Sequence, residues 1–272
     1  MLHEESASNP DPLFCTQQRA ILDLWDSIQR LQTDFAFAQE LSAYYLCPQW
    51  HSCSTVLDIG TGNGYYLGKL AARFPGKRYH GVDVSGELIA IAEKEVTDTS
   101  VSFSHRSLFD VSEPYDFVLM RLLLQHLNDI PAVLDHVSTI TRHGGSALII
   151  DAHDAFRFFY PALPEFTQFF SIYAEHQRKA GREREVVKLV EQAIRMSSSW
   201  RWGSSLQLLI PSTIRGNLEL FTHTYTFFAD LVSQTGELQY DFSALKDAWQ
   251  DWSQIPNAYA QVGLNLITIH RV

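Results

Sequence analysis

The stretch Thr55–Gly64, which reads TVLDIGTGNG, decides the fold of this chain. Its first half is short, apolar and β-branched, which is typical of a buried strand in a parallel sheet. Glycines then alternate at positions 60, 62 and 64 and predict a tight turn, because glycine adopts unusual backbone conformations at little cost. A helical pattern over residues 65–74 follows and ends at Pro75 and Gly76. Strand, glycine turn and helix together predict a nucleotide-type site over the carboxyl end of the strand.

The spacing of the glycines narrows the choice of ligand. Dinucleotide-binding proteins carry G-x-G-x-x-G after their first strand, whereas this chain has Gly60, Gly62 and Gly64, preceded by Asp58. The resulting D-x-G-x-G-x-G pattern resembles motif I of the class I S-adenosylmethionine (SAM) dependent methyltransferases. A glycine turn after a strand can also be purely structural, so the rest of the chain must decide between the two interpretations.

Composition excludes several classes of protein. The chain of 272 residues is 46% hydrophobic and 19% charged, as in globular proteins. No apolar run approaches the roughly 18 residues that span a bilayer, and Met1–Glu5 lacks the basic and apolar parts of a signal peptide. We therefore expect a cytoplasmic protein that does not contact membranes. The formal net charge of −10, without a basic block, argues against a nucleic-acid partner and favours a small-molecule acceptor.

The cysteines and histidines do not predict a metal site. Cys47, His51 and Cys53 have a spacing that matches no zinc module. No two histidines stand four residues apart, as they do on a zinc-binding helix. We expect reduced thiols and no metal.

Strand and helix patterns alternate along most of the chain, which predicts a doubly wound α/β sheet. The expected strands are 55–59, 78–84, 101–106, 114–121, 146–151, 205–210 and 263–270, and the helices between them 65–74, 87–95, 128–143, 218–233 and 242–252. The resemblance implies a mostly parallel seven-stranded sheet whose last strand is antiparallel and lies between the fifth and the sixth.

Two segments stand outside this alternation. Residues 17–45 repeat apolar residues at helical spacing up to Pro48. This helix either packs on the sheet edge or, as the resemblance implies, covers the SAM site; it could also pair two chains into a homodimer. Residues 152–204 are rich in aromatic residues and predict two helices, 164–180 and 184–196, that form their own core or line a substrate pocket. The charged run Arg182–Glu185 between them is interpreted as a solvated face.

These patterns divide the chain into four parts. They are an N-terminal helical element at 1–50, a SAM-binding α/β core at 51–151, a helical aromatic-rich insertion at 152–204, and the C-terminal part of the core at 205–272.

Asp83 ends the second predicted strand, about 20 residues beyond the glycine turn, where a carboxylate can accept hydrogen bonds from a ribose diol. Alternatively, Asp83 only caps the next helix. Ser107 holds the place where the resembling family often carries an aspartate beside the adenine. The resemblance thus implies SAM as cofactor and S-adenosylhomocysteine as product, with the following cofactor-binding residues: Asp58, Gly60, Thr61, Gly62, Asn63, Gly64, Asp83, Val84, Ser107, Leu108, Arg121 and Leu122.

Methyl transfer is an in-line displacement for which SAM carries its own activation, so the protein chiefly aligns the reactants. An acceptor hydroxyl or ammonium group would also need a general base, for which histidine is suited near neutral pH. His126, just after the fourth strand, is the first candidate, and His153, after the fifth, is the second; Asp151 lies close to His153. His126 could instead only bond backbone near the cofactor, and His153 could be a surface loop residue.

Three functions therefore stay open. The first is a SAM-dependent methyltransferase that acts on O, N or C of a small molecule. The second is an NAD(P)-dependent oxidoreductase on a related sheet, which the glycine spacing disfavours. The third is a SAM-binding enzyme that does not methylate, or a silent subunit of the same fold.

Overall fold

The computed structural model describes residues 19–213, 216–236 and 238–272. Residues 1–18, including the start of the expected N-terminal element, lie outside this description. The helices are α1 (Arg19–Leu46), α2 (Pro48–Ser52), α3 (Tyr65–Arg73), α4 (Gly86–Glu95), α5 (Ile130–Ile140), α6 (Pro164–Lys179), α7 (Val187–Met196), α8 (Asn217–Thr235) and α9 (Phe242–Ser253). Short 3-10 turns are η2 (Leu108–Asp110), η3 (Leu124–His126) and η4 (Asp154–Phe156).

The strands form one sheet in the order β3-β2-β1-β4-β5-β8-β6, with β7 also paired to β8. Their bounds are β1 (Thr55–Ile59), β2 (Arg78–Asp83), β3 (Val101–His105), β4 (Tyr115–Arg121), β5 (Thr141–Ala152), β6 (Phe158–Tyr160), β7 (Trp200–Pro211) and β8 (Tyr259–Arg271). β1 to β5 pair in parallel, and β8 is antiparallel to β5, β6 and β7. The predicted doubly wound sheet, with its last strand between the fifth and the sixth predicted ones, is confirmed.

The sheet has one strand more than predicted. Phe158–Tyr160 (β6) pairs with Tyr259–Gln261 of β8 inside the segment expected to be helical. A three-residue strand is too short for period-two alternation to mark it in the sequence.

Two predicted helix ends were wrong. The helix expected to run to residue 143 ends at Ile140, and the chain enters β5 at Thr141. Gly144 and Gly145 therefore lie within a strand, near a register shift between β4 and β5, instead of ending a helix. Pro48 does not end α1, which ends at Leu46; it begins α2, where its missing N–H has no helical partner to lose.

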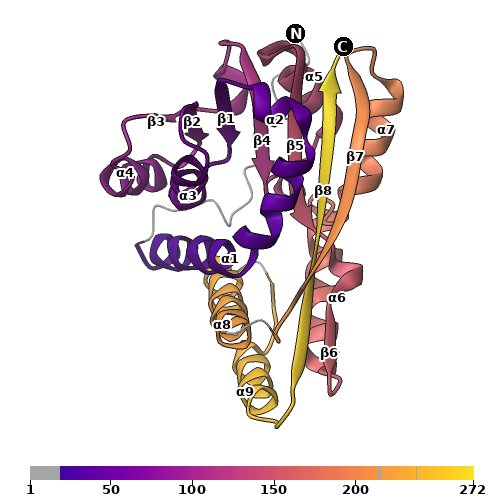
Figure 1. The fold of residues 1–272 in the computed structure, drawn as a ribbon. Coiled ribbons are helices and arrows are strands. Elements are labelled where there is room, and N and C mark those ends of the chain that lie inside the picture. Colours follow the sequence, from indigo (N-terminus) through magenta and orange to yellow (C-terminus); the bar gives the residue numbers. More distant parts are fainter. Residues whose placement is uncertain (1–18, 214–215, 237) are drawn as a thin grey trace.

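Both faces of the sheet are covered. Phe117, Leu119 and Leu148 face a core formed with α2, α3, α8 and α9, whereas Val118, Met120 and Ile149 face a core formed with α5 and α7. This alternation along β4 is the two-sided burial expected of a parallel strand. In Figure 1, α1 lies across one end of β1 and β4, with α8 and α9 beyond it.

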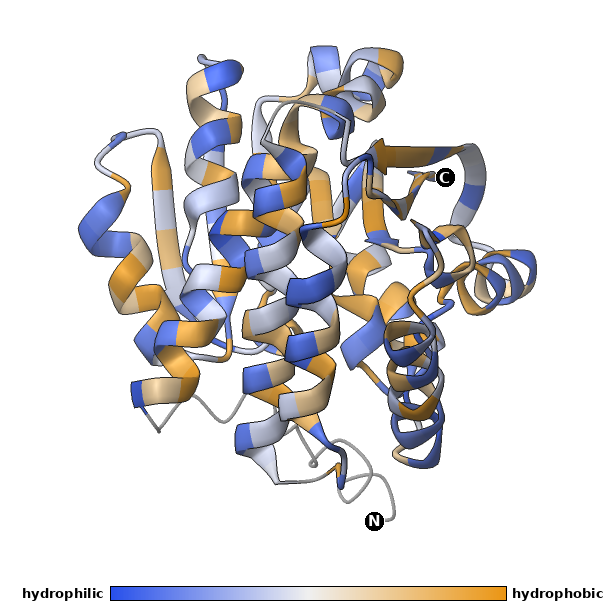
Figure 2. Ribbon diagram, turned by 90° about the horizontal axis from the view of Figure 1, so that it is seen from below, coloured by the Kyte–Doolittle hydropathy of each residue, from blue (hydrophilic) through white to orange (hydrophobic). Residues whose placement is uncertain are grey.

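The helices seen from below in Figure 2 alternate hydrophilic and hydrophobic residues along their length, as expected for helices that pack on one face. Among the described residues, no helix combines the length and the apolar character needed to cross a membrane.

Candidate active site

A cavity of about 620 Å³ lies between α1 and the carboxyl ends of the parallel strands. This volume falls within the roughly 300–1,000 Å³ of small-molecule and cofactor sites. The wall contains twelve of the fourteen predicted site residues: Asp58, Gly60, Thr61, Asn63, Asp83, Val84, Ser107, Leu108, Arg121, Leu122, His126 and His153. Gly62 and Gly64 are not in it.

The glycine turn and Asp83 meet at one corner of the cavity, here called the cofactor corner (Asp58–Gly64 with Asp83). The backbone N–H of Gly62 donates to one Asp83 oxygen at 2.8 Å, and that of Ser85 donates to the other at 2.8 Å. The cap of α4 is the Ser85 hydroxyl, which accepts from the N–H of Leu88. Asp83 thus faces the turn, as a ribose-binding carboxylate requires, and does not cap the helix.

The three glycines differ in what requires them. All three have positive φ, which L side chains rarely adopt. A Cβ on Gly64 would also lie 2.6 Å from Phe103 and 2.8 Å from Ala92, so Gly64 lets α3 and α4 pack behind the turn. A Cβ on Gly60 would meet Leu123, which lines the cavity. Gly60 therefore leaves room for Leu123 in the cavity wall, and Gly64 leaves room for the packing behind the turn.

Two buried carboxyls lie at this corner. Burial raises the pKa of Asp58 to about 7, although the nearby Thr61 hydroxyl and the charge of Arg121 oppose the shift. Burial also raises the pKa of Asp83, against the effect of its bonds from Ser85 and Gly62. A carboxyl that burial destabilises in its charged form gains most from a bound cation or hydrogen-bond donor.

The neighbouring wall is shaped by the strand ends. Leu122, directly after β4, has φ of +52°, a strained conformation for a branched residue and one that is concentrated at functional sites. Val84 and Leu108 add apolar surface. The Ser107 hydroxyl accepts from the N–H of Phe109, so part of its bonding capacity is already used.

Helix α1 closes this side of the cavity. Its Gln29 accepts from the backbone N–H of Asn63 at 2.8 Å, and Asn63 in turn donates to Asp26. Farther along, Glu40 forms an ion pair with Arg121 at 2.9 Å, almost fully buried on both sides. The helix therefore covers the cofactor corner, one of the interpretations of its sequence given above, and polar contacts hold it there.

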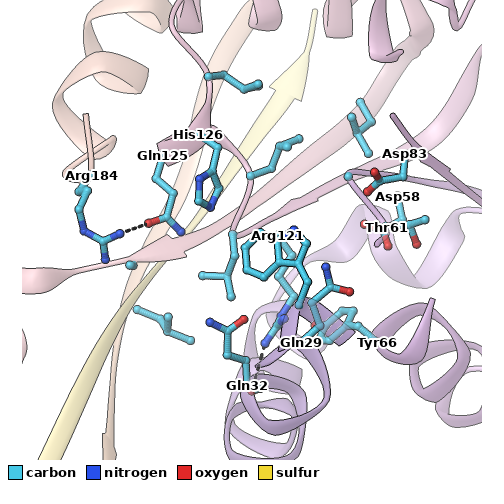
Figure 3. Close-up of a pocket in the computed structure, with 18 of the residues that line it drawn as sticks. Gln29, Gln32, Asp58, Thr61, Tyr66, Asp83, Arg121, Gln125, His126 and Arg184 are labelled. Carbon is cyan, nitrogen blue, oxygen red and sulfur yellow. Dashed lines mark hydrogen bonds between the residues drawn. The ribbon is translucent and has the colours of Figure 1, made fainter. Parts of the chain in front are cut away.

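Both candidate bases line the cavity. The ring of His126 meets Trp25 of α1 edge-on, with centroids 6.1 Å apart. The Nδ1 of His153 lies 3.0 Å from a carboxylate oxygen of Glu185. In Figure 3, His126 lies between the cofactor corner and Arg184.

The far end of the cavity combines Phe170, from the aromatic insertion that the sequence analysis gave as a possible pocket lining, with residues that it did not single out. Arg157, Phe170, Arg184 and Tyr225 line it, together with Phe221 and Phe228 of α8. The interpretation of Arg182–Glu185 as a solvated face was wrong, since Arg182 is 3% and Arg184 8% exposed. In extended backbone the side chains of residues 182 and 184 point to the same side. This spacing would have indicated shared burial only if the loop had been known to be extended.

The α1 lining was also missed. Gln29, Gln32 and Ala36 are three and four residues apart and lie on one helical face toward the cavity. The sequence did carry a signal for this lining, because polar residues interrupt the apolar stripe of the helix. In the described part of the chain, no cluster of three or more histidine, cysteine or acidic residues could hold a metal ion.

Comparison with known proteins agrees with this geometry. A family model described as "Methyltransferase domain" matches residues 19–202. Malonyl-[acyl-carrier protein] O-methyltransferase of Priestia megaterium is 28% identical over 123 residues, which are 44% of this chain and 40% of that protein. Ribosomal RNA small subunit methyltransferase G of Bacteroides fragilis is 30% identical over 89 residues, 31% of this chain and 43% of the relative. The matches thus span about two fifths of these curated relatives.

A solved structure extends the similarity to most of the fold. Phosphoethanolamine N-methyltransferase 2 of Haemonchus contortus, in complex with S-adenosyl-L-methionine, matches with a TM-score of 0.55 at 16% identity. That match covers 93% of this chain and 58% of the other, so the likeness includes α1 and the insertion. The family model covers more than half of the sequence, and the chain therefore belongs to the methyltransferase domain family, with the fold and glycine turn of class I SAM-dependent methyltransferases.

Proposed function

We propose that this protein transfers the methyl group of SAM to a nucleophilic O, N or C atom of a small molecule. The observation that carries the proposal is the single cavity that joins the cofactor corner to an aromatic, arginine-containing far end under α1 and α8. A covered cavity of about 620 Å³ suits a cofactor beside a small acceptor better than a duplex or a folded protein. The matched relatives named for protein-bound and RNA acceptors share only part of their length with this chain.

The residues present fit SAM. Asp83 retains acceptor capacity for a ribose diol beyond its two backbone bonds. The buried Asp58 carboxyl suits the positive charge of the methionyl part. Val84 and Leu108 offer apolar contact to the adenine. When bound, SAM supplies an electrophilic methyl group on a sulfonium; the chain aligns the acceptor with it and excludes water.

His126 is the proposed general base, because it lies between the two ends of the cavity (Figure 3). His153, held by Glu185, is the second candidate at the acceptor side. A base that removes a proton in the rate-limiting step contributes roughly 10²–10⁴-fold. If His126 has this role, His126→Asn lowers kcat by that order and removes the acidic limb of the pH profile, while His153→Asn changes both less.

The test begins with the purified protein. Mass spectrometry should find retained SAM or S-adenosylhomocysteine, and SAM should bind in calorimetry while NAD(P) does not. Incubation with SAM and a panel of small hydroxyl, amine and carbon acceptors should then produce S-adenosylhomocysteine. Binding of NAD(P) in place of SAM would overturn the proposal in favour of an oxidoreductase. Binding of SAM without any S-adenosylhomocysteine would favour a non-methylating enzyme or a silent subunit.

A further inference from the structure

Arg184 lies at the far end of the cavity, opposite Asp58 and Asp83 (Figure 3), and belongs to a buried group of charges. Asp154 of η4 accepts from Arg184 at 2.5 and 3.0 Å and from Arg157 at 2.5 Å. The side chains of the two arginines are 10% and 13% exposed, so the group is largely removed from solvent. We call Asp154, Arg157 and Arg184 the arginine pair site.

Within this site two guanidiniums share one carboxylate. Among the described residues, Asp154 is the carboxylate in contact with either guanidinium, and both of its oxygens are engaged. Asp151 lies behind Gln125 and is held by backbone N–H groups of Gln125 and Ala152, and burial raises its pKa to about 6. Glu185 pairs with His153. Asp151 and Glu185 thus add negative charge near the site, but neither bonds Arg157 or Arg184, and guanidinium N–H groups remain for a ligand.

The guanidiniums are held in fixed planes. That of Arg157 lies over the ring of Phe170 at 3.4 Å, and that of Arg184 lies near Tyr173 at 5.4 Å. Tyr225 lines the same end of the cavity, and Gln125 accepts from Arg184 at 2.8 Å. Stacked planar guanidiniums keep their donors oriented and match the paired oxygens of carboxylate and phosphate groups.

We propose that the methyl acceptor carries an anionic oxyacid group, a carboxylate or a phosphate, and that Arg157 and Arg184 bind it. This inference rests on the proposed function, because it assigns the far end of the cavity to the acceptor. The anion fixes one end of the acceptor and directs its nucleophile toward His126 and the cofactor corner. The alternative is that the ion pairs only fasten the insertion to the core, in which case one arginine would balance Asp154.

Binding of matched probes to the protein loaded with S-adenosylhomocysteine tests this inference. Benzoate and phenyl phosphate are the anionic probes, and benzamide and benzyl alcohol are neutral probes of similar shape. We expect at least one anion to bind about tenfold or more tighter than either neutral probe, since charge-assisted hydrogen bonds are the stronger ones. Tighter binding of benzoate would identify a carboxylate, and tighter binding of phenyl phosphate a phosphate.

Variants decide whether the arginines cause the preference. Arg157→Gln and Arg184→Gln should each reduce it to about twofold or less, and Arg157→Lys should retain only part of it. Arg178→Gln is the matched control, because Arg178 is exposed on α6 and forms its ion pair with Glu175 on the same helix. The affinity for S-adenosylhomocysteine reports folding in every variant and should stay within about twofold of wild type. Arg157→Gln can be tested even if Arg184→Gln does not fold.

Three results would overturn the inference while SAM binding persists. They are equal binding of neutral and anionic probes, no binding of either anion, and an anion preference that survives in the arginine variants that fold. Failure of the proposed function looks different: S-adenosylhomocysteine would not bind, or no acceptor would be methylated, whatever the anion preference.

Discussion

Two carboxyls at opposite ends of one cavity have pKa values that shift in opposite directions. At the cofactor corner, burial raises the pKa of Asp58 to about 7. At the arginine pair site, burial alone would also raise the pKa of Asp154, but the charges of Arg184 and Arg157 lower it well below its usual range. The corner thus holds a carboxyl that an incoming cation would stabilise, whereas at the arginine pair site two arginines share one carboxylate. One fold thus offers different electrostatics to a sulfonium cofactor and to the proposed anionic acceptor.

The largest expected effect is on stability, which should depend on pH in opposite ways for variants of Asp58 and of Asp154. The pKa of Asp58 is raised on folding from about 3.9, so its contribution to stability is present below pH ~4 and is lost as pH rises to ~7. Asp58→Asn should therefore be more stable than wild type at pH 8, by up to about 4 kcal/mol, and similar at pH 4. The pKa of Asp154 is lowered, so Asp154→Asn should destabilise at pH 7 and lose that effect as pH falls below ~4.

Urea unfolding of the SAM-free protein at pH 3, 4, 6 and 8 measures both effects. If Asp58→Asn followed the wild-type dependence on pH, the comparison between the two ends would lose its basis.

The second effect concerns α1, which joins the two ends by covering both. Glu40→Gln leaves the charge of Arg121 buried without its partner, and such changes cost about 3–5 kcal/mol. The control is Asp34→Asn, also on α1. It breaks a half-exposed ion pair with Lys69 of α3 and should lower the free energy of unfolding by about 1 kcal/mol or less. Urea midpoints give both values, and equal losses would show that α1 is not fastened through Arg121.

The two ends also differ in how far the sequence predicted them. The cofactor corner depends on backbone conformation within Asp58–Gly64 and on Asp83 at the end of the adjacent strand. Because parallel strands end at one edge of a sheet, local patterns were enough to place these residues together. Gly62 and Gly64 lie outside the cavity wall, and their prediction as cofactor residues stays a prediction. The N–H of Gly62 bonds Asp83, whereas Gly64 makes room for Phe103 and Ala92, and the sequence pattern alone does not separate these two roles.

The arginine pair site could not be predicted in the same way. Its three residues come from η4, the segment after η4 and the loop between α6 and α7, and they lie beside Gln125 of η3 and Tyr225 of α8. No fixed spacing links Gln125, Arg184 and Tyr225, and burial of Arg184 depends on aromatic residues of α6 whose position only tertiary packing sets. Charged residues between two helices usually face solvent, and here the stacking on Tyr173 and the Asp154 carboxylate offset the cost of burial.

A third effect tests the cofactor corner directly. Asp83→Ala removes the acceptor for Gly62 and Ser85 and for a ribose diol, and hydrogen bonds to a charged group contribute roughly 1.5–3 kcal/mol each. SAM should bind about 100-fold more weakly in calorimetry, while the anion preference at the arginine pair site stays unchanged. The control is Asp98→Ala, because Asp98 is an exposed acid that accepts a hydrogen bond from Ser100. Wild-type SAM affinity in Asp83→Ala would show that the corner does not bind the ribose.

The smallest expected effect comes from alanine at Gly60 or Gly76. The two variants distinguish the cost of the backbone conformation from a change in the shape of the site. Gly60 and Gly76 both have positive φ, of +74° and +91°, so alanine at either should cost a similar 1–2 kcal/mol, about the left-handed penalty for a side chain. A Cβ at position 60 would lie 2.8 Å from Leu123, whereas nothing lies within 4 Å of one at position 76. Because Leu123 lines the cavity, Gly60→Ala should push it inward and weaken SAM binding about tenfold, and Gly76→Ala should not. Urea midpoints and calorimetry on the two variants measure the two quantities separately. Equal SAM affinities at equal stability would mean that Gly60 serves only the turn.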